Sequence, residues 1–312
     1  MNTSPTGANV TGSFRDFPLR VRLDSSNFDF SQARDDGWDL RFSGKDEMPL
    51  PFEIESWDQA GKQGIAWVKL DSIVGNDSGQ LIRMYWGQGN ADSESHPHVV
   101  FNSPNFGAVW HFQNLGAGSP PALKNASAAG DTAYAGDFPN GSSLVDTHLG
   151  KGVHQNGKQS ELYTGKPFTN PGNLTLSLWF RTTTDSGGLL LGLEKAQASA
   201  DSTLERDRQI WMDDSGIIRF GIAESISGGI TEHMAASPAA YNDGNWHWAV
   251  GMVSSAGTAL YLDGKQVALD PTGTVALNYT GYWRMGFSYP LSDWPGAPAA
   301  GGFRSGALPA GA

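Results

Sequence analysis

Two glutamates two residues apart on one predicted strand have the spacing of a catalytic pair. Glu53 and Glu55 lie in the run 51–57, whose alternation of apolar and polar residues predicts a β-strand. Side chains two apart on a strand leave the same face about 7 Å apart at the backbone. Carboxylates so spaced can serve as acid and base, or acid and nucleophile, in glycoside hydrolysis, and Trp57 would share their face. The alternative is the solvent-facing polar side of a half-buried strand.

A second acidic group surrounds Trp211 and consists of Glu205, Asp207, Asp213 and Asp214. Such carboxylates can take part in catalysis, hydrogen-bond a sugar or supply oxygen ligands to Ca²⁺. The alternative is a set of solvated loop carboxylates. If the protein is a hydrolase, its candidate catalytic residues are Glu53, Glu55, Glu205 and Asp207.

The chain is rich in aromatic residues, with 11 Trp, 8 Tyr and 15 Phe. Aromatic rings bury large areas and can stack on the apolar faces of sugar rings. The sequence predicts ligand contacts at Trp179, Arg181, Trp211, Asp213 and Trp283. The alternative is that most of these Trp side chains belong to the core or to the packing between sheets.

Alternation along residues 173–181 predicts which side chains leave the core. The apolar face comprises Leu174, Leu176, Leu178 and Phe180, and the opposite face comprises Thr175, Ser177, Trp179 and Arg181. If the leucine face is the core, Trp179 points out of it. Trp211 shows the same inverse pattern between Ile210 and Met212, and Trp283 flanks a late strand.

A neighbouring segment, 242–250, contains two further tryptophans. Trp246 and Trp248 share a strand face with Val250 and Met252. We therefore predict that both rings belong to the core, with His247 facing the other way.

Composition excludes several classes of chemistry. With no cysteine, the 312-residue chain has no disulfide, thiolate metal site or cysteine nucleophile. Its net charge of −11 argues against nucleic-acid binding through a basic surface. No Gly-x-Ser-x-Gly elbow, phosphate-binding loop or dinucleotide fingerprint appears, and no apolar run of about 18 residues predicts a membrane span. The sequence thus predicts no required cofactor, with Ca²⁺ left open.

Three segments of the C-terminal half each read as a strand with a turn: 173–181, 242–250 and 258–265, the last ending in the hairpin signal Asp263-Gly264. Together they resemble the laminin-G-like and concanavalin A-like jelly rolls, over roughly residues 105–305. The resemblance implies two sheets packed face to face, often with one concave face presented to a glycan. The chain lacks the Glu-x-Asp-x-x-Glu motif of laminarinase-type jelly-roll hydrolases, which weakens the case for an enzyme.

The N-terminal third has strand patterns of its own, at residues 17–23, 51–57, 65–70 and 80–86. The runs 17–18, 50–55, 67–68 and 84–87 resemble a bacterial domain of unknown function (type 2341). That domain often precedes a laminin-G-like jelly roll in large secreted or envelope proteins. Its own role is not settled, so the resemblance supports architecture more than activity.

Polar, proline-containing stretches at 93–98 and 102–105 are typical of a linker. We therefore predict a small N-terminal β-sandwich over residues 1–103 and a concanavalin A-like jelly roll over residues 104–312. The jelly rolls that the chain resembles usually close with a strand containing an Ile-Asp-Glu-Val-like run, whereas residues 301–308 lead into Pro-Ala-Gly-Ala, so the resemblance implies that the jelly roll is truncated at its last strand. Residues 1–7 contain no signal peptide.

The sequence therefore predicts an all-β protein that binds carbohydrate through its jelly roll. Its expected partner is a polysaccharide or glycan, with no nucleic acid and no membrane span. Its expected location is extracellular or in the cell envelope, with the native signal peptide absent from this chain. Two alternatives stay open: a glycoside hydrolase acting on a plant or microbial polysaccharide, and a protein-adhesion module.

Overall fold

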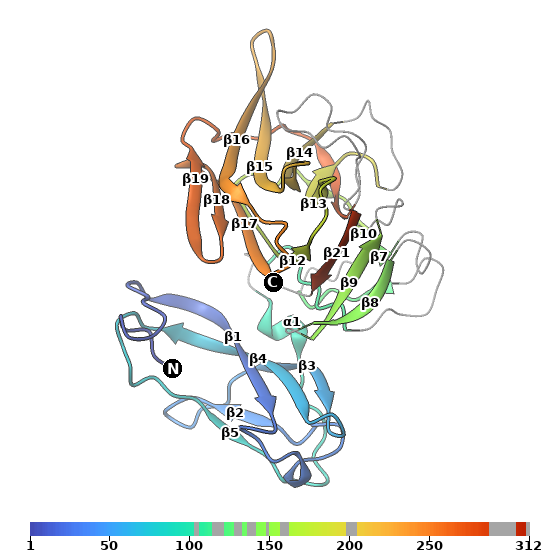
Figure 1. Ribbon diagram of the computed structural model, residues 1–312. Helices are drawn as coiled ribbons and strands as arrows, with labels where there is room; N and C mark the ends of the chain where they lie inside the picture. The colour runs from blue at the N-terminus through green and yellow to red at the C-terminus, as the bar shows by residue number, and fades with distance from the viewer. Residues whose placement is uncertain are drawn as a thin grey trace. The chain divides into compact units, whose positions relative to one another are not determined.

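A computed structural model describes residues 1–102, 106–113, 122–127, 133–135, 142–147, 150–156, 162–197, 205–286 and 304–309. The chain divides into two units (Figure 1): unit 1 is Met1–Val109 with Asn125–Gly130, and unit 2 is Trp110–Lys124 with Asp131–Ala312. Antiparallel strands dominate both units, which confirms the predicted all-β class. The division predicted between residues 103 and 104 lies at the edge of a segment outside the described residues and stays a prediction.

Unit 1 contains two small sheets, β1-β4-β3 and β2-β5. Its elements are β1 (Phe14–Asp24), the 3-10 helix η1 (Phe30–Gln32), β2 (Arg41–Ser43), β3 (Phe52–Asp58), β4 (Gln63–Ile73), β5 (Arg83–Tyr85) and α1 (Pro97–Val100). Alternating apolar residues of both sheets meet in one core, which includes Leu23, Phe42, Phe52 and Val68. Phe28 and Phe30 complete that core from the segment around η1.

A second cluster of unit 1 includes the later segment 125–127. Ala126 is buried with Val100, Phe101 and Val109. The Asn125 side-chain oxygen accepts a hydrogen bond from the backbone N–H of Val109 at 2.9 Å. Burial and this hydrogen bond together fix the returning segment.

Unit 2 contains a nine-stranded and a seven-stranded sheet. Its strands are β6 (Ala122–Leu123), β7 (Ala133–Ala135), β8 (Ser142–Thr147), β9 (Gly150–Asn156), β10 (Leu162–Thr164), β11 (Phe168–Thr169), β12 (Leu174–Thr182), β13 (Gly188–Glu194), β14 (Arg206–Met212), β15 (Ile217–Ile226), β16 (Gly229–Ala240), β17 (His247–Ser254), β18 (Gly257–Leu262), β19 (Lys265–Asp270), β20 (Thr280–Met285) and β21 (Arg304–Pro309). The nine-stranded sheet runs β16-β15-β14-β13-β20-β10-β7-β6, with β11 also on β20, and the seven-stranded sheet runs β19-β18-β17-β12-β21-β9-β8. Figure 1 shows β15 and β16 as a long hairpin that extends beyond their neighbours.

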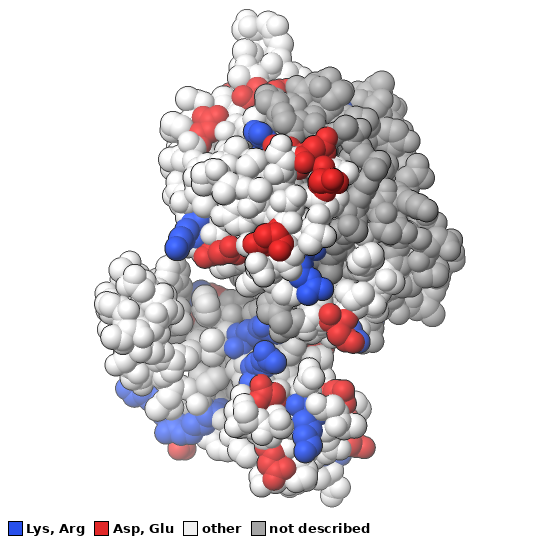
Figure 2. Space-filling view, viewed as in Figure 1, with Lys and Arg blue, Asp and Glu red and all other residues white. Residues whose placement is uncertain are grey.

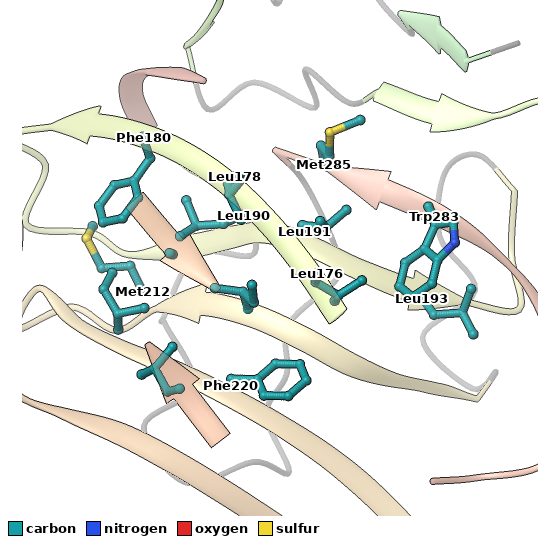
Figure 3. Close-up of a cluster of buried hydrophobic side chains, with 14 of the residues drawn as sticks. Leu176, Leu178, Phe180, Leu190, Leu191, Leu193, Met212, Phe220, Trp283 and Met285 are labelled. Carbon is teal, nitrogen blue, oxygen red and sulfur yellow. The ribbon is translucent and has the colours of Figure 1, made fainter. Parts of the chain in front are cut away.

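The two sheets of unit 2 share one apolar core, part of which is shown in Figure 3. Leu176, Leu178 and Phe180 of β12 belong to it, as their alternation predicted. The sheets approach so closely that a Cβ on Gly251 of β17 would lie 2.5 Å from the ring of Phe220 in β15. Each fully buried side chain of this kind contributes about 1.5–3 kcal/mol, so the core fixes which face of each strand points outward.

Strand β21, near the C-terminus of the chain, lies between β12 and β9 in the seven-stranded sheet and pairs with both. Whether the chain is truncated at its last strand stays a prediction. Residues 115–148, which lack a clear period in the sequence, include the short strands β6, β7 and β8.

Candidate functional site

A pair of tryptophans lies on the outer face of the seven-stranded sheet. Trp179 of β12 is directly opposite Trp248 of β17 in the antiparallel ladder. Their ring centroids are 6.1 Å apart and their planes differ by 12°. The Trp248 indole N–H donates to the Ser177 hydroxyl at 2.8 Å, which holds the ring against β12. Cross-strand partners project from the same face of a sheet, so the two half-buried indoles form one apolar surface.

Arg181 extends this surface along β12. Its side chain is exposed, and its guanidinium carbon lies 5.0 Å from the centroid of the Trp246 ring. A cation held over an aromatic face gains about 0.5–1 kcal/mol at an exposed site. The arrangement keeps a positive charge and its hydrogen-bond donors beside the tryptophan pair.

Tyr261 of β18 extends the surface in the other direction. It is paired with Val250 of β17, which is paired in turn with Ser177 of β12. The Tyr261 hydroxyl donates to the side chain of Gln266 at 3.3 Å. We call this outer surface the tryptophan strip; it comprises Ser177, Trp179, Arg181, Trp246, Trp248 and Tyr261.

The predicted core position of Trp248 is wrong. In β17 the fully buried positions are Ala249, Gly251 and Val253, whereas Trp248 and Val250 are half-buried on the opposite face. Nearly every position of β17 is apolar, so alternation alone does not reveal the buried face. Phe220 decides it, because its ring needs the space that glycine leaves at position 251. Trp246, also predicted to be core, is half-buried beneath Arg181.

His247 fixes the turns next to the tryptophan strip. Its Nε2 lies 3.0 Å from a carboxylate oxygen of Asp243, and its Nδ1 lies 2.9 Å from one of Asp263. Burial lowers the pKa of His247, but the hydrogen bonds and charges of Asp263 and Asp243 outweigh it and hold that pKa above its usual value. Hydrogen bonds from the Asn245 backbone, from His247 and from the Asn245 side chain bring the pKa of Asp243 down to about 2.

A ligand contact was predicted at Trp211, but its ring is buried in the structure. It leaves β14 on the side away from the main core, but it is 0% exposed. Ala223, Met234 and Leu277 surround it in a separate cluster. A ring in this position packs the outer layer of the nine-stranded sheet.

Asp213 has a structural environment. It is 7% exposed, accepts hydrogen bonds from the backbone N–H groups of Ser215 and Ile217, and forms a 2.9 Å ion pair with Arg219. Its oxygens thus stabilise the turn between β14 and β15. The ligand contact predicted at Asp213 stays a prediction.

Trp283 belongs to the main core. It is 7% exposed and is paired with Leu193 of the neighbouring strand β13. Figure 3 shows it among the buried leucine side chains. Trp283 therefore has no exposed ring face for the ligand contact that was predicted.

Glu205, directly before β14, and Asp207 of β14 differ from each other. Glu205 is exposed and forms a 2.8 Å ion pair with Lys195, whose hydrogen bond lowers the pKa of Glu205. Asp207 is 0% exposed and pairs with the equally buried Arg208. Burial raises the pKa of Asp207 despite the charge of Arg208. The pair belongs to the packing of the sheet.

Glu53 and Glu55 do not share a face with Trp57. A β-bulge between Ile54 and Ser56 shifts the alternation by one residue. Trp57 consequently joins the core of unit 1, with its ring 4.9 Å from that of Phe30.

The two glutamates lie instead around Trp67 of β4. Glu53 is 7% exposed and is paired with Trp67 in the ladder. Glu55 accepts a 2.5 Å hydrogen bond from the Trp67 indole N–H. Their catalytic role stays a prediction.

Family comparisons identify both parts of the chain. Residues 36–107 match the family described as a domain of unknown function (DUF2341), and residues 155–302 match the concanavalin A-like lectin/glucanases superfamily. Residues 36–107 are thus similar to a DUF2341 domain and residues 155–302 to a concanavalin A-like domain, and neither match covers half of the chain. Both resemblances drawn from the sequence, and their order, are confirmed.

Several solved structures are similar to this chain at low identity. Trypanosoma rangeli sialidase in complex with the inhibitor DANA has 10% identity and a TM-score of 0.41, and the match covers 86% of this chain and 40% of the sialidase chain. Domain 4 of AbnA, a GH43 extracellular arabinanase from Geobacillus stearothermophilus, in complex with arabinotriose has 14% identity and a TM-score of 0.33, covering 60% of this chain and 86% of that one. Mouse laminin alpha1 domains LG4-5 have 14% identity and a TM-score of 0.31, covering 98% and 84%. No curated protein matches the chain. At these TM-scores the matches support no assignment of a site or an activity to this chain.

Within the described parts of both domains, no cluster of three or more His, Asp or Glu could hold a metal ion. No helix there is long and apolar enough to cross a membrane. In the concanavalin A-like domain, Trp179 and Arg181 are the predicted ligand residues that keep an outward position. Trp248 and Tyr261 were missed: the predicted Asp263-Gly264 turn joins β18 to β19, whereas Tyr261 lies opposite Val250 through the separate hairpin of β17 and β18.

Proposed function

We propose that the concanavalin A-like domain binds a polysaccharide through the tryptophan strip, as part of an extracellular or envelope protein. The observation that carries this proposal is the parallel pair Trp179 and Trp248 beside the exposed Arg181. Indole rings offer apolar area for the C–H faces of sugar rings. The guanidinium of Arg181 and the amide of Gln266 supply hydrogen-bond donors for hydroxyl groups.

The strip is preorganised for this task. Trp248 is fixed by its hydrogen bond to Ser177, and both rings stand on paired strands of one sheet. Side chains already held in position lose little conformational entropy when a ligand binds. The proposal therefore predicts measurable affinity from a small set of residues.

Affinity electrophoresis of the full chain in gels containing xylan, mixed-linkage glucan, laminarin or mannan tests the proposal. Trp179→Ala and Trp248→Ala should each weaken binding about tenfold, the factor that corresponds to about 1.4 kcal/mol. Leu269→Ala removes an apolar side chain that is 46% exposed on β19, outside the strip, and should leave affinity unchanged. Equal retardation of all three variants and the wild type would overturn the assignment.

A parallel assay of reducing-end release addresses the hydrolase alternative. Release by the wild type that is lost in Glu53→Gln or Glu55→Gln would replace the binding proposal by a catalytic one. Absence of both retardation and release would favour the adhesion alternative instead.

A further inference from the structure

The DUF2341 domain exposes three large aromatic side chains that its core does not use. Trp38 is 46% exposed, Tyr85 is 45% exposed and Trp86 is 41% exposed. They come from two segments, 32–41 and 85–94, that lie far apart in the sequence. Exposed apolar side chains that form a patch mark a binding surface more often than single exposed residues do.

Strand pairing places Tyr85 on the outside. Arg41 of β2 is opposite Tyr85 of β5, and Phe42 is opposite Met84. Phe42 is buried in the core and Met84 packs against it, so the Arg41–Tyr85 pair faces outward. The Tyr85 hydroxyl lies 3.2 Å from the hydroxyl of Ser43, which orients the ring. Trp86, the next residue, leaves on the opposite face, where its ring contacts the core residue Phe28, so Tyr85 lies outside the surface that Trp86 and Trp38 form.

Arg34 fixes Trp38 next to the second segment. Its guanidinium carbon lies 5.6 Å from the Trp38 ring centroid, and its NH1 donates to the carbonyl of Gly89 at 2.6 Å. Two further hydrogen bonds, at 2.9 and 2.6 Å, join Arg34 to the carboxylate of Asp36. The Trp38 ring therefore packs against a guanidinium that three hydrogen bonds hold in place.

Trp86 is held by both segments as well. Its indole N–H donates to the side-chain oxygen of Gln32 at 3.3 Å, and its ring meets Phe28 edge to face at 5.2 Å. The buried carboxylate of Asp39 accepts hydrogen bonds from the backbone N–H groups of Gly87 at 2.7 Å and Arg34 at 3.0 Å. These contacts preorganise the aromatic surface at little further entropic cost to a ligand.

A hollow adjoins this aromatic surface. It has a volume of about 940 Å³ and is lined by the loops 25–31 and 59–62. Phe28, which contacts Trp86, forms part of its wall, and Asn27, Gln59 and Lys62 contribute polar groups. Most of the lining residues are polar, and Phe28 and Phe30 add apolar rings, so the hollow offers hydrogen-bonding groups for sugar hydroxyls beside aromatic surface for C–H faces.

The charges around the surface indicate the kind of sugar. Arg34 is neutralised by Asp36, and Arg41 forms a 3.2 Å ion pair with Glu94 and donates to the carbonyls of Trp38 and Asp92. Basic and acidic side chains are likewise interspersed on the visible face of this domain in Figure 2. The hollow adds one charge of each sign, Lys62 and Asp29. An acidic polysaccharide would therefore meet no excess of positive charge on this surface, whereas a neutral one needs only ring faces and hydrogen bonds.

We infer that Trp38 and Trp86, together with the adjoining hollow, form a binding site for a neutral polysaccharide in the DUF2341 domain. This site is separate from the tryptophan strip and does not depend on it. The chain would then carry two glycan sites, whose linkage raises the effective concentration of each for a long polymer.

The test uses the full chain with Trp179→Ala and Trp248→Ala already introduced, so that the tryptophan strip is silenced. Affinity electrophoresis is run with hydroxyethyl cellulose, arabinoxylan and mixed-linkage glucan as neutral probes and alginate as the acidic probe. Added Trp38→Ala should weaken retardation by a neutral probe about tenfold. Met48→Ala removes a side chain that is 62% exposed in the same domain and should have no effect.

Trp86 contacts the core residue Phe28, so its replacement by alanine would also disturb the core. The second variant is therefore the milder Trp86→Phe. Trp86→Phe keeps an apolar ring at the core edge and should weaken binding less than Trp38→Ala, with an unchanged thermal midpoint. Three results would overturn the proposal: no retardation by any neutral probe, retardation that Trp38→Ala leaves intact, or stronger retardation by alginate. Self-association that disappears with Trp38→Ala would assign the surface to protein contact and would also overturn it.

Discussion

The two sheets of unit 2 each carry a tryptophan on their outer face, but one ring is partly exposed and the other is covered. Trp179 in β12 and Trp211 in β14 both alternate with core residues, yet Trp179 is half-buried and Trp211 is 0% exposed. Strand alternation gives each ring the same predicted orientation. The difference teaches that alternation identifies the side of a sheet but not what covers that side.

The cover over β14 comes from a distant part of the chain. Leu277 packs against Trp211, and its backbone carbonyl accepts a 2.7 Å hydrogen bond from Arg208. Its backbone N–H donates to Asp207 at 3.1 Å, and the Tyr279 hydroxyl donates to the carbonyl of Leu193 at 2.7 Å. A buried ionic network thus attaches the covering segment.

The largest contrast is expected from removing the two rings. Trp211→Ala should lower the free energy of unfolding by about 3–5 kcal/mol, because it leaves a cavity between the sheet and Leu277. Trp179→Ala should cost only about 1–2 kcal/mol, since its ring is partly exposed and loses chiefly its contact with Trp248. Urea unfolding followed by circular dichroism measures both. Equal losses would mean that both rings are equally buried in solution.

A second contrast compares the neighbouring carboxylates Asp207 and Glu205. Asp207→Asn should cost about 3 kcal/mol because it leaves the charge of Arg208 buried and unpaired. Glu205→Gln breaks only the exposed pair with Lys195, which contributes about 0–1 kcal/mol. The same unfolding measurement decides; a small effect of Asp207→Asn would show that the covering segment is not held by the ionic network.

Local patterns predicted much of the fold. The leucine face of β12 and the Asp263-Gly264 turn depend on neighbouring residues alone, and both agree with the structure. Trp57 was assigned to the wrong face because a bulge, which no local pattern announced, shifts the alternation after Ile54. Trp248 was misassigned because Phe220, on another sheet, decides which side of β17 is buried.

The candidate sites were harder to predict for the same reason. Trp283 and Trp211 have the residue type expected of a sugar contact, but only their nonlocal surroundings show that they are buried. The exposed ring of Trp38 depends on Arg34, which in turn depends on the carbonyl of Gly89. Such placements arise from contacts between segments that a reading of one segment at a time does not connect.

A third prediction concerns the energy of the outer pair itself. A double-mutant cycle of Trp179→Ala and Trp248→Ala should give a coupling of about 0.5–1.5 kcal/mol, the range for aromatic pairs beyond buried area. Phe168 and Trp283, whose rings meet at 6.0 Å in the core, provide the buried comparison. Additive effects at positions 179 and 248 would show that the rings do not contact each other in solution.

The smallest expected effect is the pH dependence of the turn beside Trp248. Because the folded-state pKa of His247 is raised by Asp263 and Asp243 against the opposing effect of burial, protonated His247 stabilises the fold. That contribution is fully present below the unfolded pKa, about 6.5, and is lost as the pH rises through the folded pKa above it. The thermal midpoints of wild type and His247→Gln should therefore differ most in mild acid and converge on the alkaline side. A difference that instead grows with pH would mean that neutral His247 is the stabilising form, with the two aspartates acting only as hydrogen-bond acceptors.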